Sequence, residues 1–452
     1  TLSRANAQAL VGEWIATMRP RHEAAWAPDV TARRIISWLA HSPMILEGAD
    51  HRFYRGFVRS LSRQARYLRR TAPDAEDGLP RLLGAIALTD VGLCLAGQGR
   101  LLKQSARWLE DELCRQILPD GGHVSRNPGV LIELLLDLLP LRQAFLARGV
   151  GPPRALLNAI DRMTPMLRFF RHGDGVFASF NGMSATPGDA LATVLAYDDA
   201  RGRPVRSAPH SGFQRLEAGR AVVVVDAGRP PPLGLSHTAH AGCLSFELSS
   251  GPARIVVNCG APLVDDEAWR TASRATAAHS TLTLADSSSC RFVGSAALKR
   301  WVGVPILSGP EQVTVERREQ EGTTSLVLSQ DGYAKGFGLV HARHLTLWGD
   351  GCRLMGEDAL LPAAGGTARD LPYTVRFHLH PAVRVLGTAE TTVRLGLPSG
   401  ETWLFETEGG ALEVEDSVYL AAQQGPKRTA QIVIQGRVAA LPRLPWSFTR
   451  VA

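Results

Sequence analysis

The sequence lacks the signatures of several common protein classes. It has only six cysteines in 452 residues and no closely spaced pair, so neither a disulfide scaffold nor a thiolate zinc site is predicted. No apolar run reaches the roughly 18 residues that a membrane-spanning helix needs. Nucleotide-binding glycine loops, the HExxH motif and the GxSxG motif are absent. The sequence therefore gives no support for the usual nucleotide-dependent, zincin or serine-hydrolase mechanisms.

Acidic residues are scarce in the first half of the chain relative to basic ones. Residues 1–206 carry 27 Lys and Arg against 20 Asp and Glu, whereas residues 207–452 carry 23 of each. The whole net charge of +7 therefore lies in the first half. A basic surface raises the local concentration of anions, so an acidic partner is expected for this half.

The periodicity of apolar residues divides the chain into two domains. In residues 1–200, apolar residues recur at helical spacing, which predicts about seven helices. In residues 207–452, about ten short β-branched runs bounded by Gly, Pro, Asp and Ser follow without intervening helices. This order predicts a helical domain followed by an antiparallel β-sandwich.

A set of arginines repeats every three or four residues between positions 52 and 70: Arg52, Arg55, Arg59, Arg63, Arg66, Arg69 and Arg70. This spacing places most of them along one stripe of a helix. Such a stripe is typical of a solvated outer face, and the sequence places no substrate on it.

Two polar, glycine-rich turns in the helical half carry groups that could bind a substrate or move a proton. The first is the loop 119–128, which contains His123, Arg126 and Asn127 between two apolar helices. The second contains His172 and Asp174 and leads to Asn181, where amide and aromatic groups could receive a sugar; Tyr333 completes this expected substrate-binding set. A plain connecting loop and a tight turn built by Asp-Gly and Asn-Gly are the structural alternatives.

Histidines also gather at the strand edges of the second half. His237, His240 and His279 could converge on one ion or one substrate group, with Asn258 between them in sequence. Imidazole suits zinc, and three nitrogen ligands would leave one coordination position open. The sequence names no definite cofactor; one structural zinc or calcium ion, held weakly by His240, Asn258 and His279, is the only metal that these residues suggest.

At these residues the sequence resembles the heparinase II/III family of polysaccharide lyases over nearly its whole length. No single string is specific, but their order and spacing together are. The strings are Gln116–His123, Ser211–Leu216, His240–Leu248, Ala278–Thr281, Asp331–Tyr333 with His341–Arg343, and Arg376–Pro381. The resemblance implies an incomplete (α/α) toroid followed by an antiparallel β-sandwich.

The resemblance also implies cleavage of a uronate-containing glycan by β-elimination. A uronate loses its C5 proton only when its carboxylate is neutralised, a base takes the proton and an acid protonates the leaving oxygen. The family supplies a Tyr and a following His here, where this sequence has Val130 and Leu131. We therefore expect Arg126 or Asn127 to hold the carboxylate and His123, with His237 or His240, to move the proton.

Two other functions fit the same scaffold. A glycoside hydrolase would use carboxylates such as Asp120 and Asp174, and a non-catalytic protein would bind an acidic glycan without cutting it. The expected partner is an acidic polysaccharide or oligosaccharide, with no nucleic acid and no membrane span. The sequence leaves the oligomeric state unknown. No signal peptide is visible at Thr1, so either a periplasmic or a cytoplasmic location in a bacterium is expected.

Overall fold

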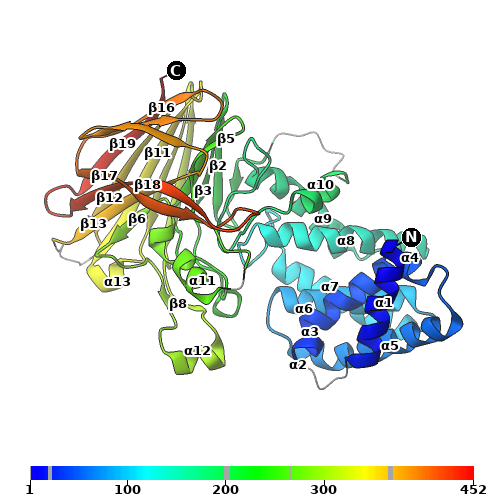
Figure 1. Ribbon diagram of the computed structural model, residues 1–452. Helices are drawn as coiled ribbons and strands as arrows, with labels where there is room; N and C mark the ends of the chain where they lie inside the picture. Colours follow the sequence, from blue (N-terminus) through cyan, green and yellow to red (C-terminus); the bar gives the residue numbers. More distant parts are fainter. Residues whose placement is uncertain (1, 19–22, 198–203, 265, 365–369, 452) are drawn as a thin grey trace. The chain divides into compact units, whose positions relative to one another are not determined.

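The computed structural model describes residues 2–18, 23–197, 204–264, 266–364 and 370–451 (Figure 1). The chain forms two compact units. The helical unit comprises Thr1–Leu118 and Glu133–Met163, and the β unit comprises Pro119–Ile132 and Thr164–Ala452. The polar loop that carries His123 therefore clusters with the strands, although it lies within the helical half of the sequence. The domain limits 1–200 and 207–452 stay a prediction.

Helices occupy the first half of the described chain, as the helical period of its apolar residues predicts. Asp50 caps one of them by accepting a hydrogen bond from the backbone N–H of Phe53. No helix in the described ranges is long and apolar enough to cross a membrane. The helices are α1 (Leu2–Thr17), α2 (Glu23–Trp26), α3 (Pro28–Ala40), α4 (Ser42–Leu46), α5 (His51–Thr71), α6 (Leu79–Cys94), α7 (Gly99–Gln116), α8 (Gly129–Ala147), α9 (Arg154–Phe170) and α10 (Gly188–Leu195).

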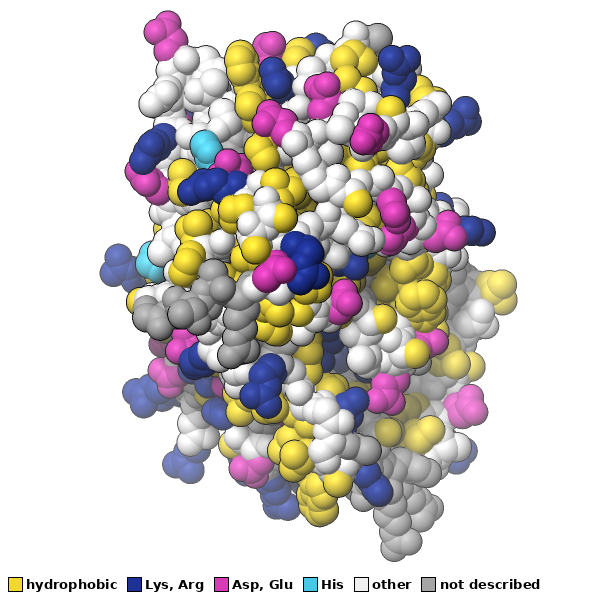
Figure 2. Space-filling model, turned by 90° about the vertical axis from the view of Figure 1, so that its left-hand side faces the viewer, with side chains coloured by type: hydrophobic (Ala, Val, Ile, Leu, Met, Phe, Trp, Pro, Cys, Tyr) yellow, Lys and Arg dark blue, Asp and Glu magenta, His cyan; other side chains and the backbone are white. Residues whose placement is uncertain are grey.

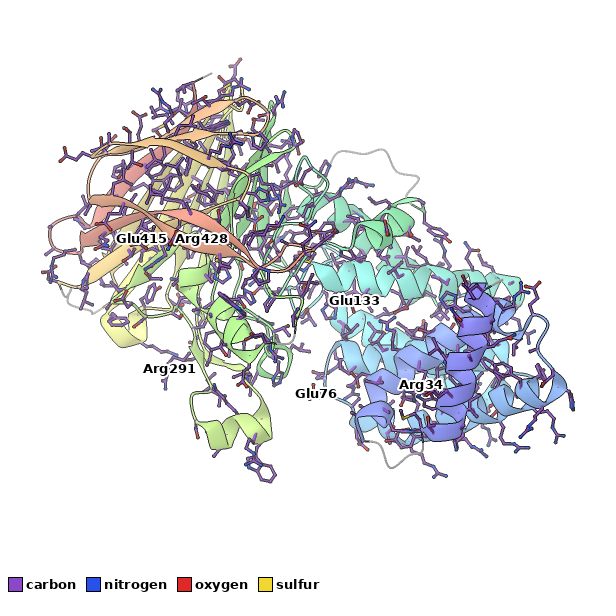
Figure 3. The ribbon with its side chains drawn as sticks, viewed as in Figure 1. Arg34, Glu76, Glu133, Arg291, Glu415 and Arg428 are labelled. Carbon is purple, nitrogen blue, oxygen red and sulfur yellow. The ribbon has the colours of Figure 1, made fainter. Side chains whose placement is uncertain are left out.

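An aromatic cluster joins the first helices of the helical unit. The ring centroids of Trp14 and Trp38 lie 5.3 Å apart at a near-perpendicular angle, and those of Trp14 and Trp26 lie 5.8 Å apart. The guanidinium of Arg34 lies 4.2 Å from the centroid of Trp14, among these helices (Figure 3). Burial lowers the pKa of Arg34 to about 10, which still leaves the side chain charged at pH 7 and available for a cation–π interaction.

The β unit contains two large antiparallel sheets. The first has the order β1-β2-β3-β4-β5-β13-β18-β17, with β6 added beside β13, and the second has the order β14-β15-β16-β19-β12-β11-β10-β9. The strands of the first sheet are β1 (Ser207–Ala208), β2 (Phe213–Ala218), β3 (Ala221–Asp226), β4 (Phe246–Ser250), β5 (Ala253–Val257), β6 (Leu282–Leu284), β13 (Pro372–Leu379), β17 (Ala411–Tyr419) and β18 (Lys427–Arg437). Those of the second are β9 (Val313–Gln320), β10 (Thr323–Gln330), β11 (Leu339–Trp348), β12 (Arg353–Pro362), β14 (Arg384–Thr388), β15 (Thr392–Gly396), β16 (Thr402–Thr407) and β19 (Arg443–Arg450).

Short elements decorate the edges of these sheets. The strands β7 (Arg291–Phe292) and β8 (Ile306–Ser308) form a small pair. The helices α11 (Glu267–Arg274), α12 (Ala296–Val302) and α13 (Ala334–Phe337) lie in the connections between strands. The sequence pattern could not predict them, because each is shorter than the window in which a helical period becomes visible.

The core of the sandwich lies between the two large sheets. Phe246 and Phe377 come from the first sheet and meet Trp446 from the second, with ring centroids 5.5 Å and 4.7 Å from that of Trp446. Such aromatic contacts add to the free energy gained by burying the rings. The predicted fold class, a helical region followed by an antiparallel β-sandwich, is confirmed.

A buried ion pair joins two neighbouring strands of the second sheet. Arg343 donates two hydrogen bonds to the two oxygens of Asp358, at 2.8 Å and 2.9 Å. His341 and Trp446 also contact this carboxylate, at 2.7 Å and 2.8 Å. The Arg343 charge and these bonds hold the pKa of Asp358 far below its ordinary value. These residues therefore tie β11, β12 and β19 together.

Candidate functional site

Hydrogen bonds within the protein occupy polar side chains of the loop 119–128, which is predicted to be catalytic. His123 is only 2% exposed, and its Nδ1 accepts a hydrogen bond from the backbone N–H of Ser125, whose hydroxyl lies 2.7 Å from the same nitrogen. Burial lowers the pKa of His123 to about 4. The imidazole is therefore neutral at pH 7. Asn127 is half-buried, and its Oδ1 accepts from the N–H of Gly129 at the start of α8.

Arg126 is fixed more firmly than any other residue of this loop. A guanidinium has five N–H donors. Arg126 donates all five: one each to the carbonyls of Ser211, Gly212, Gly228 and Arg229, and one to Asp226 Oδ1 at 2.5 Å. The residue is 8% exposed and has a φ of +62°, a strained conformation for a residue other than glycine. No donor is left to bind a substrate carboxylate.

The close packing around the Arg126 guanidinium explains why position 228 is a glycine. A Cβ atom added at Gly228 would lie 2.4 Å from Nη2 of Arg126. On its other side the guanidinium lies 4.7 Å from the ring centroid of Phe213. The loop and the β2–β3 region are therefore built around this one side chain.

Asp226 links the loop to the histidines of the sandwich. Its Oδ2 accepts from Asn181 Nδ2 at 3.0 Å, and Asn181 Oδ1 lies 3.4 Å from the backbone nitrogen of His240. Nδ1 of His240 and Nε2 of His279 are 3.1 Å apart. Because Nδ1 of His279 donates to the carbonyl of Ala275 at 2.9 Å, its Nε2 accepts and His240 donates. The structure therefore joins Arg126, Asn181, His240 and His279 in one buried network.

Both histidines of this network are neutral. Burial, followed by the proximity of His279 and Arg274, lowers the pKa of His240 well below its ordinary value. Burial also lowers the pKa of His279. Neither is a strong base at pH 7, since the low pKa of each reflects the cost of placing a charge in this interior.

A second buried network surrounds Glu247. His172 contacts this carboxylate through Nε2 at 3.1 Å and the Ser249 hydroxyl through Nδ1 at 2.8 Å. The other carboxylate oxygen accepts from the backbone N–H groups of Ser179 and Asn258, both at 3.0 Å. The predicted substrate-binding residue His172 thus lies inside the protein. Asp226 and Glu247, which organise the two networks, were missed by sequence reasoning.

The remaining predicted residues lie outside these networks. His237 is half-buried, and a Cβ at Gly303 would lie 2.8 Å from its Nδ1. Asp174 pairs with Arg254 at 2.9 Å. Tyr333 is buried, its hydroxyl donates to the carbonyl of Leu282 at 3.1 Å, and burial raises its pKa. The structure does not bring these three side chains to His240.

The predicted metal ligands do not meet the needs of zinc or calcium. His240 and His279 supply two nitrogens, while Asn258 Oδ1 accepts from the N–H of Ser280 and its amide nitrogen lies 3.4 Å from Glu247. Structural zinc takes four ligands, and calcium takes roughly six to eight oxygens. In the part of the chain that the structure describes, no group of three or more His, Cys, Asp or Glu side chains could hold a metal ion. No chemical step is therefore assigned to a metal.

Comparisons with known proteins connect this fold to a family. The family model "Heparinase II/III-like, C-terminal" matches residues 200–447. The FtsZ-localized protein C of Caulobacter vibrioides (strain NA1000 / CB15N) is 33% identical over 454 aligned positions, which cover 98% of this chain and 77% of that protein.

Solved structures of lyases share the fold at low sequence identity. A crystal structure of heparinase III matches with a TM-score of 0.75 and 14% identity, covering 98% of this chain and 72% of that one. The heparan sulfate lyase HepC from Pedobacter heparinus matches with a TM-score of 0.68 and 15% identity over the same shares. This chain belongs to the heparinase II/III-like family.

Proposed function

We propose that this chain is a non-catalytic member of the family that acts as a binding protein and localises with FtsZ. The observation that carries the proposal is the saturation of Arg126, whose five donors are all used within the protein. A β-eliminating site needs a free cationic or amide group to neutralise the uronate carboxylate. Arg126 cannot take that role without breaking its bonds to Asp226 and four carbonyls.

The groups for proton transfer are also poorly suited to elimination. Proton transfer works best when the pKa of the catalytic group lies near the working pH. His123 has a pKa of about 4, and the pKa of His240 lies well below its ordinary value. Val130 and Leu131 stand where the family resemblance leads one to expect Tyr and His, and both are buried. Each of these observations supports binding without cleavage.

The relatives support the second part of the proposal. FtsZ-localized protein C is 33% identical to this chain over the aligned positions, whereas the lyases of known structure are 14–15% identical to it. At 14–15% identity, similarity to the lyases is evidence for a shared fold only. A role in common with FtsZ-localized protein C is better supported, because that protein is similar in sequence along nearly the whole of this chain.

Incubation with uronate polysaccharides tests the loss of catalysis. We expect the purified chain to give no rise in near-ultraviolet absorbance with heparan sulfate or other acidic glycans, while a heparinase III positive control does. New reducing ends without absorbance would indicate hydrolysis. Either product signal, if it is lost in His123→Ala and Asn127→Ala variants, would restore the prediction of a glycan-cleaving enzyme and overturn this proposal.

Fluorescence microscopy tests the localisation. A fluorescent fusion of the chain, expressed in its native bacterium, should co-localise with labelled FtsZ and disperse when FtsZ is depleted. A fusion to heparinase III, which shares the fold, serves as the control and should remain dispersed throughout. An unchanged, dispersed signal for this chain in cells with normal FtsZ would contradict the proposed role.

A further inference from the structure

Helix α5 carries seven arginines and no acidic residue. Six of them, which we call the Arg stripe, fall within an arc of about 80° on the helical wheel and extend over about 27 Å of the axis: Arg52, Arg55, Arg59, Arg63, Arg66 and Arg70. Like charges three or four residues apart destabilise a helix. The Arg stripe therefore lowers the stability of the helix that carries it.

The opposite side of α5 fixes the stripe toward solvent. Phe57, Leu61 and Leu68 are buried in the helical unit. All stripe residues except Arg63 are exposed, and Arg63 lies 5.5 Å from the ring centroid of Trp26. No stripe residue forms an ion pair with a carboxylate within the described ranges. By contrast, basic and acidic side chains are interspersed on the face shown in Figure 2.

A cavity of about 660 Å³ opens beside the first half of the stripe, between α1 and α5. Its lining combines apolar groups with three stripe arginines: Ile15, Ala16 and Phe53 with Arg52, Arg55 and Arg59. The carboxylate of Asp50 also lines the cavity, and it accepts a hydrogen bond from the backbone N–H of Phe53. An apolar side chain could enter it while neighbouring carboxylates face the guanidinium groups. Cavities with apolar walls and a few placed charges are typical of binding sites.

A second cavity, of about 190 Å³, opens beside the other half of the stripe, between α5 and the helices α6 and α7. It too combines apolar walls with arginine: Ala65, Val91, Leu95 and Leu101 with Arg66 and Arg69. On the helical wheel the two cavities lie on opposite flanks of the stripe. A ligand that fills both must therefore cross the row of arginines.

We propose that the Arg stripe binds an extended acidic peptide segment whose two apolar side chains fill the two cavities. Arg55 and Arg66 are separated by about 16 Å along the helix axis, which an extended chain spans with about five residues. Arginine pairs with carboxylates through two parallel hydrogen bonds. A bilayer surface offers no side chains to enter separate cavities, and an acidic polysaccharide offers no apolar ones. The inference rests on the proposed role as a binding protein and names the partner chemistry and the surface.

Fluorescence anisotropy with the full chain tests this inference. The probe is a labelled twelve-residue peptide of Asp and Glu with two leucines five residues apart. We expect binding that weakens with added salt and falls at least roughly tenfold in an Arg55→Glu, Arg59→Glu, Arg66→Glu variant. The affinity of an Arg55→Gln, Arg59→Gln, Arg66→Gln variant for the peptide should fall by less. Replacing both leucines of the peptide by Ser should also weaken binding.

The matched control reverses the same amount of charge elsewhere on the helical unit. Lys103, Arg107 and Arg148 are exposed and lie outside the stripe, so their triple change to Glu should leave the affinity within about twofold. The inference would be overturned if both triple Glu variants lost the same affinity, or if replacing the leucines of the peptide did not change the affinity. Binding only to phosphatidylglycerol vesicles or to heparan sulfate would also overturn it. None of these outcomes bears on the lyase assay or on co-localisation with FtsZ, so the two proposals fail separately.

Discussion

Replacing Arg126 by leucine is expected to lower the free energy of unfolding by about 3–5 kcal/mol. The change leaves the Asp226 carboxylate buried without a cationic partner, bonded only to the Asn181 amide and the backbone N–H of Gly228, and it removes the Arg126 donors from four carbonyl oxygens. Removing one partner of a buried, hydrogen-bonded charge pair costs far more than the pair contributes on balance. Urea denaturation followed by tryptophan fluorescence and circular dichroism measures the loss.

A neighbouring arginine gives the control. Arg229 is exposed, and only its backbone carbonyl contacts Arg126, so Arg229→Leu should change the stability by no more than about 0.5 kcal/mol. If Arg126→Leu were equally mild, the guanidinium would not be needed for folding and would be free for a substrate. A double substitution, Arg126→Leu with Asp226→Leu, should recover part of the loss because no unpaired charge then remains.

The architecture could be predicted because the period of apolar residues reflects which face each element buries. Residues Val222–Val225 are a continuous β-branched run in the sequence, and they lie in the fully buried strand β3. The arginines between positions 52 and 70 recur at helical spacing in the sequence, and they lie in α5. Short elements such as α2 and α4 escaped prediction because four or five residues show no period. Their structure depends on tertiary contacts.

The site could be predicted only in part, because sequence shows which residues are polar but not which way they face. The sequence singled out the loop around His123 and the pair His240 and His279 as candidate site residues, and the structure shows that all three histidines are buried. What the sequence could not show is that the partners of Arg126 lie within the protein. Four of the five are carbonyl oxygens, which every residue has, so no side-chain pattern announces them.

One signal for the missed residues was nevertheless present. Asp226 ends an otherwise apolar run, and Glu247 lies between Phe246 and Leu248 in another. A carboxylate in a fully buried strand must find a cationic or hydrogen-bonding partner. Searching for such partners would have connected Arg126 and His172 with the interior rather than with a substrate. Buried charges in strands are thus a guide to structural networks when function is inferred from sequence.

Replacing Asp90 by asparagine is expected to stabilise the protein at neutral and alkaline pH. Burial, together with the nearby Asp137, raises the pKa of Asp90 to about 8. The ordinary value of 3.8 applies to the unfolded chain, so between pH 4 and 8 the folded state binds more protons and its stability falls as the pH rises. Asparagine carries no proton to lose. Because Asp90 is partly exposed, we discount the effect to about 2 kcal/mol at pH 8.

The surroundings of Asp90 explain why it rather than its neighbour stays protonated. Burial raises the pKa of Asp137 too, but two hydrogen bonds of 2.7 Å from Arg33 oppose this shift by favouring its charged form. Glu133, labelled on α8 in Figure 3, adds a third carboxylate whose pKa burial raises. One arginine cannot neutralise three carboxylates, so the proton remains on the residue that lacks a cationic partner.

Denaturation of both proteins at a series of pH values checks this account. The two stability curves should converge near pH 4, where Asp90 is protonated in the folded state and half protonated in the unfolded one, and diverge steadily up to pH 8. Glu76 is exposed (Figure 3), so Glu76→Gln, which removes the same charge, should give a curve parallel to that of the unmodified protein. If Asp90→Asn also ran parallel, Asp90 would be ionised in the folded state, and the three carboxylates would need a second cation that Arg33 does not supply.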